Sequence, residues 1–396
     1  MSTKLQQEVW ALQRCSGCGA CVAACSKGVL HWGLEQHPLL EERQKVLGLS
    51  HLKLRTCEVC DRFCELVCPR LTTEGENGTD MPELEAIGVS SARAVGVERS
   101  GATSAVIRSL LVAAYSAGLI DGAVVVDVDL WSLEPVARIV TNVEEIVSVV
   151  GPHYLWAPVL SALNEAIFER GLRQLAVVGS PCVAQGARRL VSAKNQRLWP
   201  YREAIRVTIA QFCTGVYAPD VVSDLVERRH GIARHLIQDL TVSATDGALC
   251  VTLWDGSVRN VPLTEVEAFA RAGCGSCDDY LGEWADVAVG SVGALAEHAT
   301  LITRTPAGEL LCQNARRFGL LETNPRVDRA ALDAAKAEKD RRARAQAYDK
   351  LRILMLDALS DPQKRAQVRK QFVSLYGSAR AEVAKKEECY GSCSGC

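Results

Sequence analysis

Short apolar runs alternate with longer helical patterns between residues 101 and 230. Residues 175–178 form a continuous apolar run that ends in Gly179-Ser180-Pro181, and residues 205–212 form another that ends in Cys213-Thr214-Gly215. Runs of this length between turn residues are typical of buried strands, and the Ala-rich segment after Pro181 has the spacing of a helix. The alternation predicts a mixed α/β core with parallel strands.

The same pattern extends toward the N-terminal side of this core. Small residues after Gly101 begin a helical pattern that ends at Gly118, and residues 123–126 follow as a strand. Residues 136–140 suggest an antiparallel strand. Thr141-x-x-Glu144 has the form of a capping box at the start of a short helix.

Beyond residue 230 the pattern changes. Residues 237–242 and 250–254 predict short strands, and Asp255-Gly256 predicts a hairpin turn into a further strand over residues 258–261. Residues 285–289 predict another buried strand, which ends in Gly290-Ser291. Residues 328–386 are rich in Ala, Lys, Arg and Glu and predict a helical extension, either a solvated face or a docking surface.

Composition excludes several classes of protein. The 396 residues are 48% hydrophobic with a formal charge of -2, so no basic excess indicates nucleic-acid binding. The N-terminus does not have the form of a signal peptide, and the longest apolar stretch, residues 105–126, is interrupted by Arg108 and Asp121. We expect a cytoplasmic protein that does not cross a membrane. No Ser-His-Asp set, HExxH motif or P-loop indicates hydrolysis or phosphoryl transfer.

Seventeen cysteines, far above ordinary usage, favour metal or redox sites over a disulfide framework. The first run has the C-x2-C-x2-C-x3-C spacing of bacterial ferredoxins and predicts a 4Fe-4S cluster, because zinc sites usually pair their cysteines two and two. Its members are Cys15, Cys18, Cys21 and Cys25.

A second run has one more residue in the middle and is followed by Pro69. Its members are Cys57, Cys60, Cys64 and Cys68. In two-cluster ferredoxins the fourth cysteine of each run binds the other cluster, so we expect Cys68 to join the first three cysteines and Cys25 to join the second three. Uncrossed ligation is the alternative, because the linker between the runs is long.

A third set of thiols comes from the core. Cys182 and Cys213 each follow a predicted strand, and Cys274 and Cys277 lie in a Gly-rich loop. Since ligands of α/β sheets bind at the carboxyl ends of strands, these four thiols form the ligand set of a further 4Fe-4S cluster. The chain closes with Cys389, Cys393 and Cys396, which predict either a further metal site or a reactive tail.

A small-residue helix start is a candidate seat for a cofactor phosphate. Free N–H groups at the start of this helix and the hydroxyls beside them can bind a flavin pyrophosphate, although such a start more often serves packing alone. His153 could bind an anion or move a proton, or it could be a surface residue of a turn; Gly290 would permit close approach of a ligand, or it could form a tight turn without one. The candidate cofactor residues are Ser100, Gly101, Ala102, Thr103, Ser104, His153, Ser180, Gly290 and Ser291.

The main domain resembles the beta-subunit family of coenzyme F420 hydrogenases and dehydrogenases. The matching segments are SGATSAVIRSLLVAAYSAGLIDGAVVV, HYLWAPVLSALNEAIFERGLRQLAVVGSPCVAQGARRL, FCTG and CGSCDDYLGEWADVAVGSVG, in the family's order. The resemblance implies FAD beside the 4Fe-4S cluster of the core cysteines, with Gly101, Thr103 and Ser104 near the FAD. It also implies hydride exchange with a soluble carrier. The chain departs at His153 and Ser291, where lysine and aspartate are common in the family, and in its Cys-rich tail.

Together these observations predict four regions: a ferredoxin-like domain with two clusters (1–80), a FAD and cluster core (81–327), a helical extension (328–386) and a Cys-rich tail (387–396). The expected function is that of a flavin-dependent iron–sulfur oxidoreductase. It would link coenzyme F420 or NAD(P)H to a partner enzyme such as a hydrogenase, a formate dehydrogenase or a heterodisulfide-reductase-like complex. The alternatives are a ferredoxin-fed reductase of a bulky organic substrate and a flavin-free electron relay.

Overall fold

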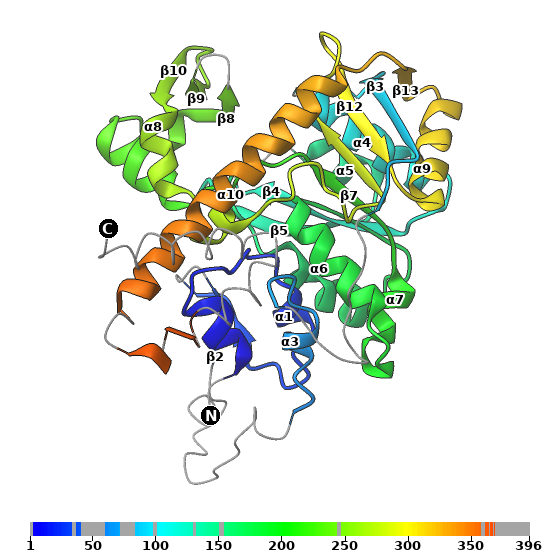
Figure 1. Ribbon diagram of the computed structural model, residues 1–396. Coiled ribbons are helices and arrows are strands. Elements are labelled where there is room, and N and C mark those ends of the chain that lie inside the picture. Colours follow the sequence, from blue (N-terminus) through cyan, green and yellow to red (C-terminus); the bar gives the residue numbers. More distant parts are fainter. Residues whose placement is uncertain are drawn as a thin grey trace.

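A computed structural model gives the fold (Figure 1). It describes residues 3–33, 37–40, 60–71, 84–97, 101–129, 132–149, 154–243, 247–357, 361–363, 365–366 and 368. The centre of the molecule is an eight-stranded mixed sheet with the order β13-β3-β12-β11-β7-β6-β4-β5. The α/β class predicted from the hydrophobic pattern is confirmed.

Four parallel strands form the middle of this sheet. They are β4 (Gly122–Val128), β6 (Leu175–Gly179), β7 (Ile205–Gln211) and β11 (Val287–Gly290). Both faces of these strands are covered, and this is why their sequences are nearly continuous apolar runs. The predicted strands at 123–126, 175–178 and 205–212 are confirmed; β11 begins two residues later than residue 285, where we expected it.

Antiparallel strands complete the sheet on both sides. β5 (Pro135–Val140) pairs with β4, as predicted. On the other side β12 (Ala299–Thr303), β3 (Gly88–Ala94) and β13 (Leu321–Asn324) follow β11. The pattern of the sequence did not predict these three strands, and β3 lies near the start of the expected core region (81–327).

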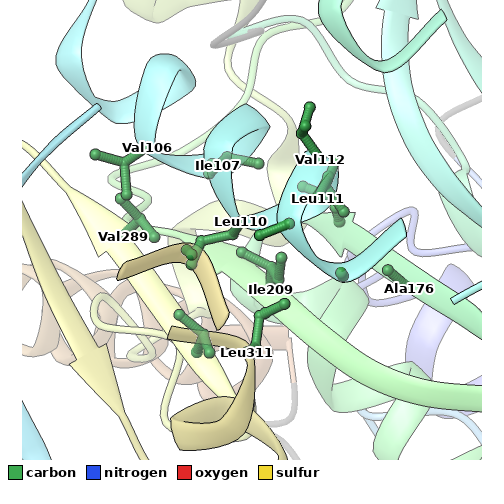
Figure 2. Packing of buried hydrophobic residues seen from close by; sticks show 14 of the residues in the cluster. Val106, Ile107, Leu110, Leu111, Val112, Ala176, Ile209, Val289 and Leu311 are labelled. Atoms are coloured by element: carbon green, nitrogen blue, oxygen red, sulfur yellow. The ribbon is translucent and has the colours of Figure 1, made fainter. Parts of the chain in front are cut away.

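One face of the sheet is covered by α4 (Ala102–Ser116), α9 (Pro306–Arg317) and α5 (Val143–Ser148). Figure 2 shows side chains of α4 such as Leu110 meeting Ile209 of β7, Val289 of β11 and Leu311 of α9. The predicted capping box of α5 is wrong by one residue. Asn142 is the cap and accepts from the Glu145 N–H at 2.8 Å, because Asn is a stronger cap than Thr.

The opposite face packs against α6 (Pro181–Ser192), α7 (Trp199–Ala204) and the helical turns η2 (Val159–Ala162), η3 (Glu165–Glu169) and η4 (Gln196–Leu198). The N-terminal segment joins the same core. It contains η1 (Leu5–Trp10), α1 (Ala20–Ala23), β1 (Leu30–His31), β2 (Leu39–Leu40) and α3 (Phe63–Leu66). The described part of the N-terminal segment therefore packs directly against the α/β core.

A small three-stranded antiparallel sheet projects from the core (Figure 1). Its strands are β8 (Ile237–Ser243), β9 (Ala248–Leu253) and β10 (Val258–Pro262), and the predicted hairpin at Asp255-Gly256 is confirmed. The helices η5 (Val221–Arg229), η6 (Arg234–Leu236), α8 (Leu263–Val266) and η7 (Glu267–Phe269) surround it.

The last long element is α10 (Arg329–Asp357), which runs diagonally across the molecule in Figure 1. It starts beside the large sheet and passes over η8 (Ala272–Ser276), the turn that carries Cys274. Among the helices that the structure describes, none combines the length and the apolar character that a membrane span requires.

Candidate functional site

The four core thiols meet beyond the carboxyl ends of β6 and β7. Cys182 lies in the first turn of α6, directly after β6, and Cys213 lies two residues after β7. The Cys213 thiol interacts electrostatically with the thiols of Cys274, Cys182 and Cys277. Gly215 lies close to η8, since a Cβ on Gly215 would stand 3.7 Å from the Cβ of Cys274. The fold thus brings together thiols distributed between residues 182 and 277.

Three cations lie beside this core set. Arg70, from the N-terminal segment, is half-buried and interacts with the Cys277 sulfur. Lys339 of α10 interacts with the thiols of Cys213, Cys277 and Cys274. Arg271 is 2% exposed and stacks on Trp156, with its guanidinium carbon 3.9 Å from the ring centroid. Buried cations are costly without negative counter-charges, so this environment suits an anionic group.

The N-terminal thiols line two cavities that are distinct from the core set. Cys15, Cys18, Cys21 and Cys68 line one cavity. Cys25, Cys60 and Cys64 line a second cavity, between η1 and α3. Cys57 lies outside the described residues, as do Cys389, Cys393 and Cys396. The structure therefore groups Cys68 with the first run and Cys25 with the second.

The first N-terminal set and the core set are in direct contact. A Cβ on Gly273 would stand 2.1 Å from the carbonyl oxygen of Cys15, and a Cβ on Gly186 would stand 3.1 Å from the Cys18 sulfur. The Cys182 thiol donates to the Ser16 carbonyl at 3.9 Å. Glycine at position 273 allows its backbone to approach that of Cys15. Glycine at position 186 allows α6 to approach Cys18.

The burial of these thiols changes their pKa values. Burial raises the pKa of Cys15 to about 11 and that of Cys213 to about 12. Burial also acts to raise the pKa of Cys277, but Arg70 and Lys339 hold it below its ordinary value. A metal-bound thiol is deprotonated outright, so a cluster removes the cost that burial places on these thiolates.

The thiols supply the donor type of an iron–sulfur cluster. Within the described ranges, no group of three or more His, Cys, Asp or Glu side chains is arranged to hold one metal ion. Cysteine thiolates are the ligands of 4Fe-4S clusters, so the donor chemistry of the thiol sets fits such clusters.

A large cavity adjoins the core thiols. The space along its lining is about 870 Å³, which includes open solvent. Its lining runs from α4 across the ends of β4, β6 and β7 to Cys213. Ser104 is 5% exposed and lines this cavity, and its Oγ has no hydrogen-bond partner in the described structure. A buried hydroxyl without a partner, beside a helix start, fits a polar cofactor.

The candidate cofactor residues divide between this cavity and other places. Ser104 and Ser180 line it. Gly101, with φ +41°, precedes α4, and Ala102 and Thr103 begin that helix, but none of the three lines the cavity. A Cβ on Gly290 would stand 2.0 Å from the Phe212 ring, so that glycine serves close packing, and Ser291 is exposed. Ser100 and His153 lie outside the described residues.

Several lining residues were missed in the sequence. Arg108 is 4% exposed and donates from Nε to the Val149 carbonyl at 3.0 Å, although it occupies an apolar helix pattern. Tyr154 also lines the cavity, and burial raises its pKa. Gln211 and Thr214 also line the cavity and lie near Cys213. Their position at the carboxyl end of β7 could have identified them in the sequence.

Thiol sets of this kind, built on and beside an α/β sheet, define an iron–sulfur protein of the electron-transfer class. The family model for the C terminus of the coenzyme F420 hydrogenase/dehydrogenase beta subunit matches residues 172–329. The model for the N-terminal part of the same beta subunit matches residues 89–164, and a 4Fe-4S dicluster domain model matches residues 14–71. The chain belongs to the coenzyme F420 hydrogenase/dehydrogenase beta-subunit family.

Individual relatives agree with this assignment. An uncharacterized protein of Methanocaldococcus jannaschii is 31% identical over 359 residues, which cover 86% of this chain and 97% of that protein. One subunit of the F420H2 dehydrogenase of Methanosarcina mazei is 30% identical over 304 residues, with 74% and 80% covered. A chain of the F420-reducing [NiFe] hydrogenase complex of Methanosarcina barkeri shares the fold, with a TM-score of 0.62, 24% identity, and 68% and 95% coverage.

Proposed function

We propose that the chain is an iron–sulfur flavoprotein subunit that links a soluble two-electron carrier to a redox partner protein. The carrier is coenzyme F420 or NAD(P)H, and the partner is a hydrogenase, a formate dehydrogenase or a related complex. The observation that carries the proposal is the continuity of the large cavity, which extends from the unpartnered Ser104 hydroxyl to Cys213 of the core set.

Three 4Fe-4S clusters complete this proposal. The core set would hold one. Cys15, Cys18, Cys21 and Cys68 would hold a second, and Cys57, Cys60, Cys64 and Cys25 a third, in the crossed arrangement that the two N-terminal cavities support. When bound, FAD converts two-electron hydride transfer into one-electron transfer, and the clusters conduct single electrons.

The residues of the chain have distinct tasks in this scheme. Ser104 and the start of α4 would bind the polar part of FAD, and Arg108 would supply positive charge in the same wall. The contacts of Gly273 and Gly186 hold the core set against the Cys15 loop, so that electrons pass between adjacent sites within one rigid unit. Electrons would then pass from the core set to the first N-terminal set and on to the thiols of the second N-terminal cavity, which is the proposed exit toward the partner.

The test is anaerobic mixing of the purified chain with reduced F420, NADH and NADPH in turn, while flavin absorbance is followed. Rapid bleaching by reduced F420 alone supports the proposal with F420 as carrier, and bleaching by a nicotinamide supports it with that carrier. A bound flavin that none of the three reduces would favour a ferredoxin-fed reductase of an organic substrate. Absence of flavin after reconstitution would contradict both and leave an electron relay.

A further inference from the structure

Helix α10 brings a segment from outside the family match onto the core thiols. The match to the C-terminal family model ends at residue 329, where α10 begins. The helix then crosses the Cys274–Cys277 turn, and its Gln346 side chain lies so close to Gly275 that a Cβ there would stand 1.8 Å from Oε1. This part of the chain is therefore packed directly on the core set.

Lys339 is the buried cation that α10 contributes. The residue is 6% exposed, and its Nζ donates to the carbonyl oxygens of Cys213 and, at 2.8 Å, Asp279. These carbonyls belong to Cys213 itself and to the second residue after Cys277. The ammonium is thus fixed by main-chain acceptors from both sides of the core set.

Lys339 differs from most buried lysines in its counter-charges. Among the described residues, no carboxylate oxygen lies within ion-pair distance of Lys339 Nζ. The nearby Asp279 carboxylate instead accepts from Gln185 Nε2 and from the Glu283 N–H, both at 3.1 Å. The negative charges that Lys339 faces are mainly the thiols of the core set, which favour a buried cation only as thiolates.

We propose that Lys339 sets the reduction potential of the cluster at the core thiols by stabilising its reduced form. Reduction adds one negative charge to a cluster, and a fixed cation in a buried site attracts the reduced form more strongly than the oxidised form. The charge would make this cluster a better electron acceptor beside the large cavity. The inference rests on the proposed cluster at Cys182, Cys213, Cys274 and Cys277.

The same helix supplies a matched control. Lys336 lies three residues earlier and forms an ion pair with the Glu283 carboxylate, and its side chain is 43% exposed. Its charge is neutralised by a carboxylate and screened by solvent, so it contributes little to the field at the core set. Lys336→Met therefore removes a lysine of α10 without removing the buried charge.

The experiment is a potentiometric titration of the anaerobic, cluster-loaded full chain, followed by electron paramagnetic resonance. In Lys339→Met and Lys339→Gln, one cluster alone shifts to lower potential. At a fixed solution potential its reduced-to-oxidised ratio falls about tenfold, which corresponds to about 59 mV for one electron. Lys339→Arg and Lys336→Met keep the wild-type potentials. Glutamine retains N–H donors, so its effect reports charge rather than hydrogen bonding.

Unchanged potentials in Lys339→Met and Lys339→Gln, at full iron content, would overturn the inference and leave Lys339 as an anchor of α10. If Lys339→Met loses iron, the test rests on Lys339→Arg and Lys339→Gln, because both side chains keep N–H donors. Equal reduction potentials in these two variants would overturn the inference. If Cys213→Ala contains as much iron as the wild-type chain, the core thiols hold no cluster. That result would overturn the proposed function together with this inference.

Discussion

The chain assembles sulfur ligands in two ways, and the comparison separates local from tertiary control. In the N-terminal segment three thiols come from one run, folded by Gly17 and Gly19 at φ +79° and +90°. In the core, the four thiols come from the ends of β6 and β7 and from η8, far apart in sequence. A tight run needs only its own turns, whereas the core set exists only when the sheet is folded.

The largest expected effect removes one ligand from each set. Cys21→Ala and Cys213→Ala each lower the iron content from about twelve to about eight per chain, because each loses one cluster. Only Cys213→Ala also loses FAD, because Cys213 lines the large cavity and Cys21 does not. Iron, sulfide and flavin assays on both variants measure this. Equal loss of flavin in Cys21→Ala would show that the two regions are not separable.

A smaller effect is expected where the two sets touch. Gly273→Ala would place a Cβ 2.1 Å from the Cys15 carbonyl oxygen, and relief of this overlap costs about 1–3 kcal/mol. We expect cluster absorbance to be lost at a lower temperature and electron transfer from flavin to the N-terminal clusters to slow. Gly215→Ala is the control, since its Cβ would meet Cys274 at an ordinary 3.7 Å. Identical melting of the two variants would refute the contact.

The smallest effect concerns the cavity alone. Ser104→Ala removes the unpartnered hydroxyl of a residue that lines the cavity and weakens FAD binding about tenfold, the value of one hydrogen bond of about 1.4 kcal/mol. Ser109→Ala is a close control, because Ser109 is buried on the same helix, also lacks a partner for its Oγ among the described residues, and does not line the cavity. Flavin titration of the apoprotein measures the FAD affinity of both variants. An equal loss of FAD affinity in Ser109→Ala would contradict the assignment of Ser104 to FAD binding.

Much of the sheet could be predicted because its middle strands carry the simplest pattern. β6 and β7 are short apolar runs that end in turn residues and a cysteine. β3 could not be predicted in this way, since its GVSSARA sequence is polar. Its Ser91 is fully buried, and its hydroxyl donates to the Arg326 carbonyl at 2.6 Å, so a distant segment satisfies a polar group within the sheet.

The candidate site divides in the same way. Cysteine spacing indicated which thiols belong to the N-terminal runs, and strand ends indicated Cys182 and Cys213. The cations around the core set had no such signal. Arg70 follows one cysteine run, and Lys339 lies in a charge-rich helix whose sequence is typical of a solvated face. Only the fold shows that these charges lie against thiols far away in sequence.

The most direct test of the proposed function is the cofactor content of the full chain, purified without oxygen and reconstituted with iron, sulfide and FAD. We predict about twelve irons, about twelve acid-labile sulfides and about one FAD per chain. We also predict that Cys213→Ala lowers both iron and FAD. About eight irons with no bound flavin, unchanged in Cys213→Ala, would contradict the proposed function, because the core thiols would then hold neither a cluster nor the edge of a cofactor site.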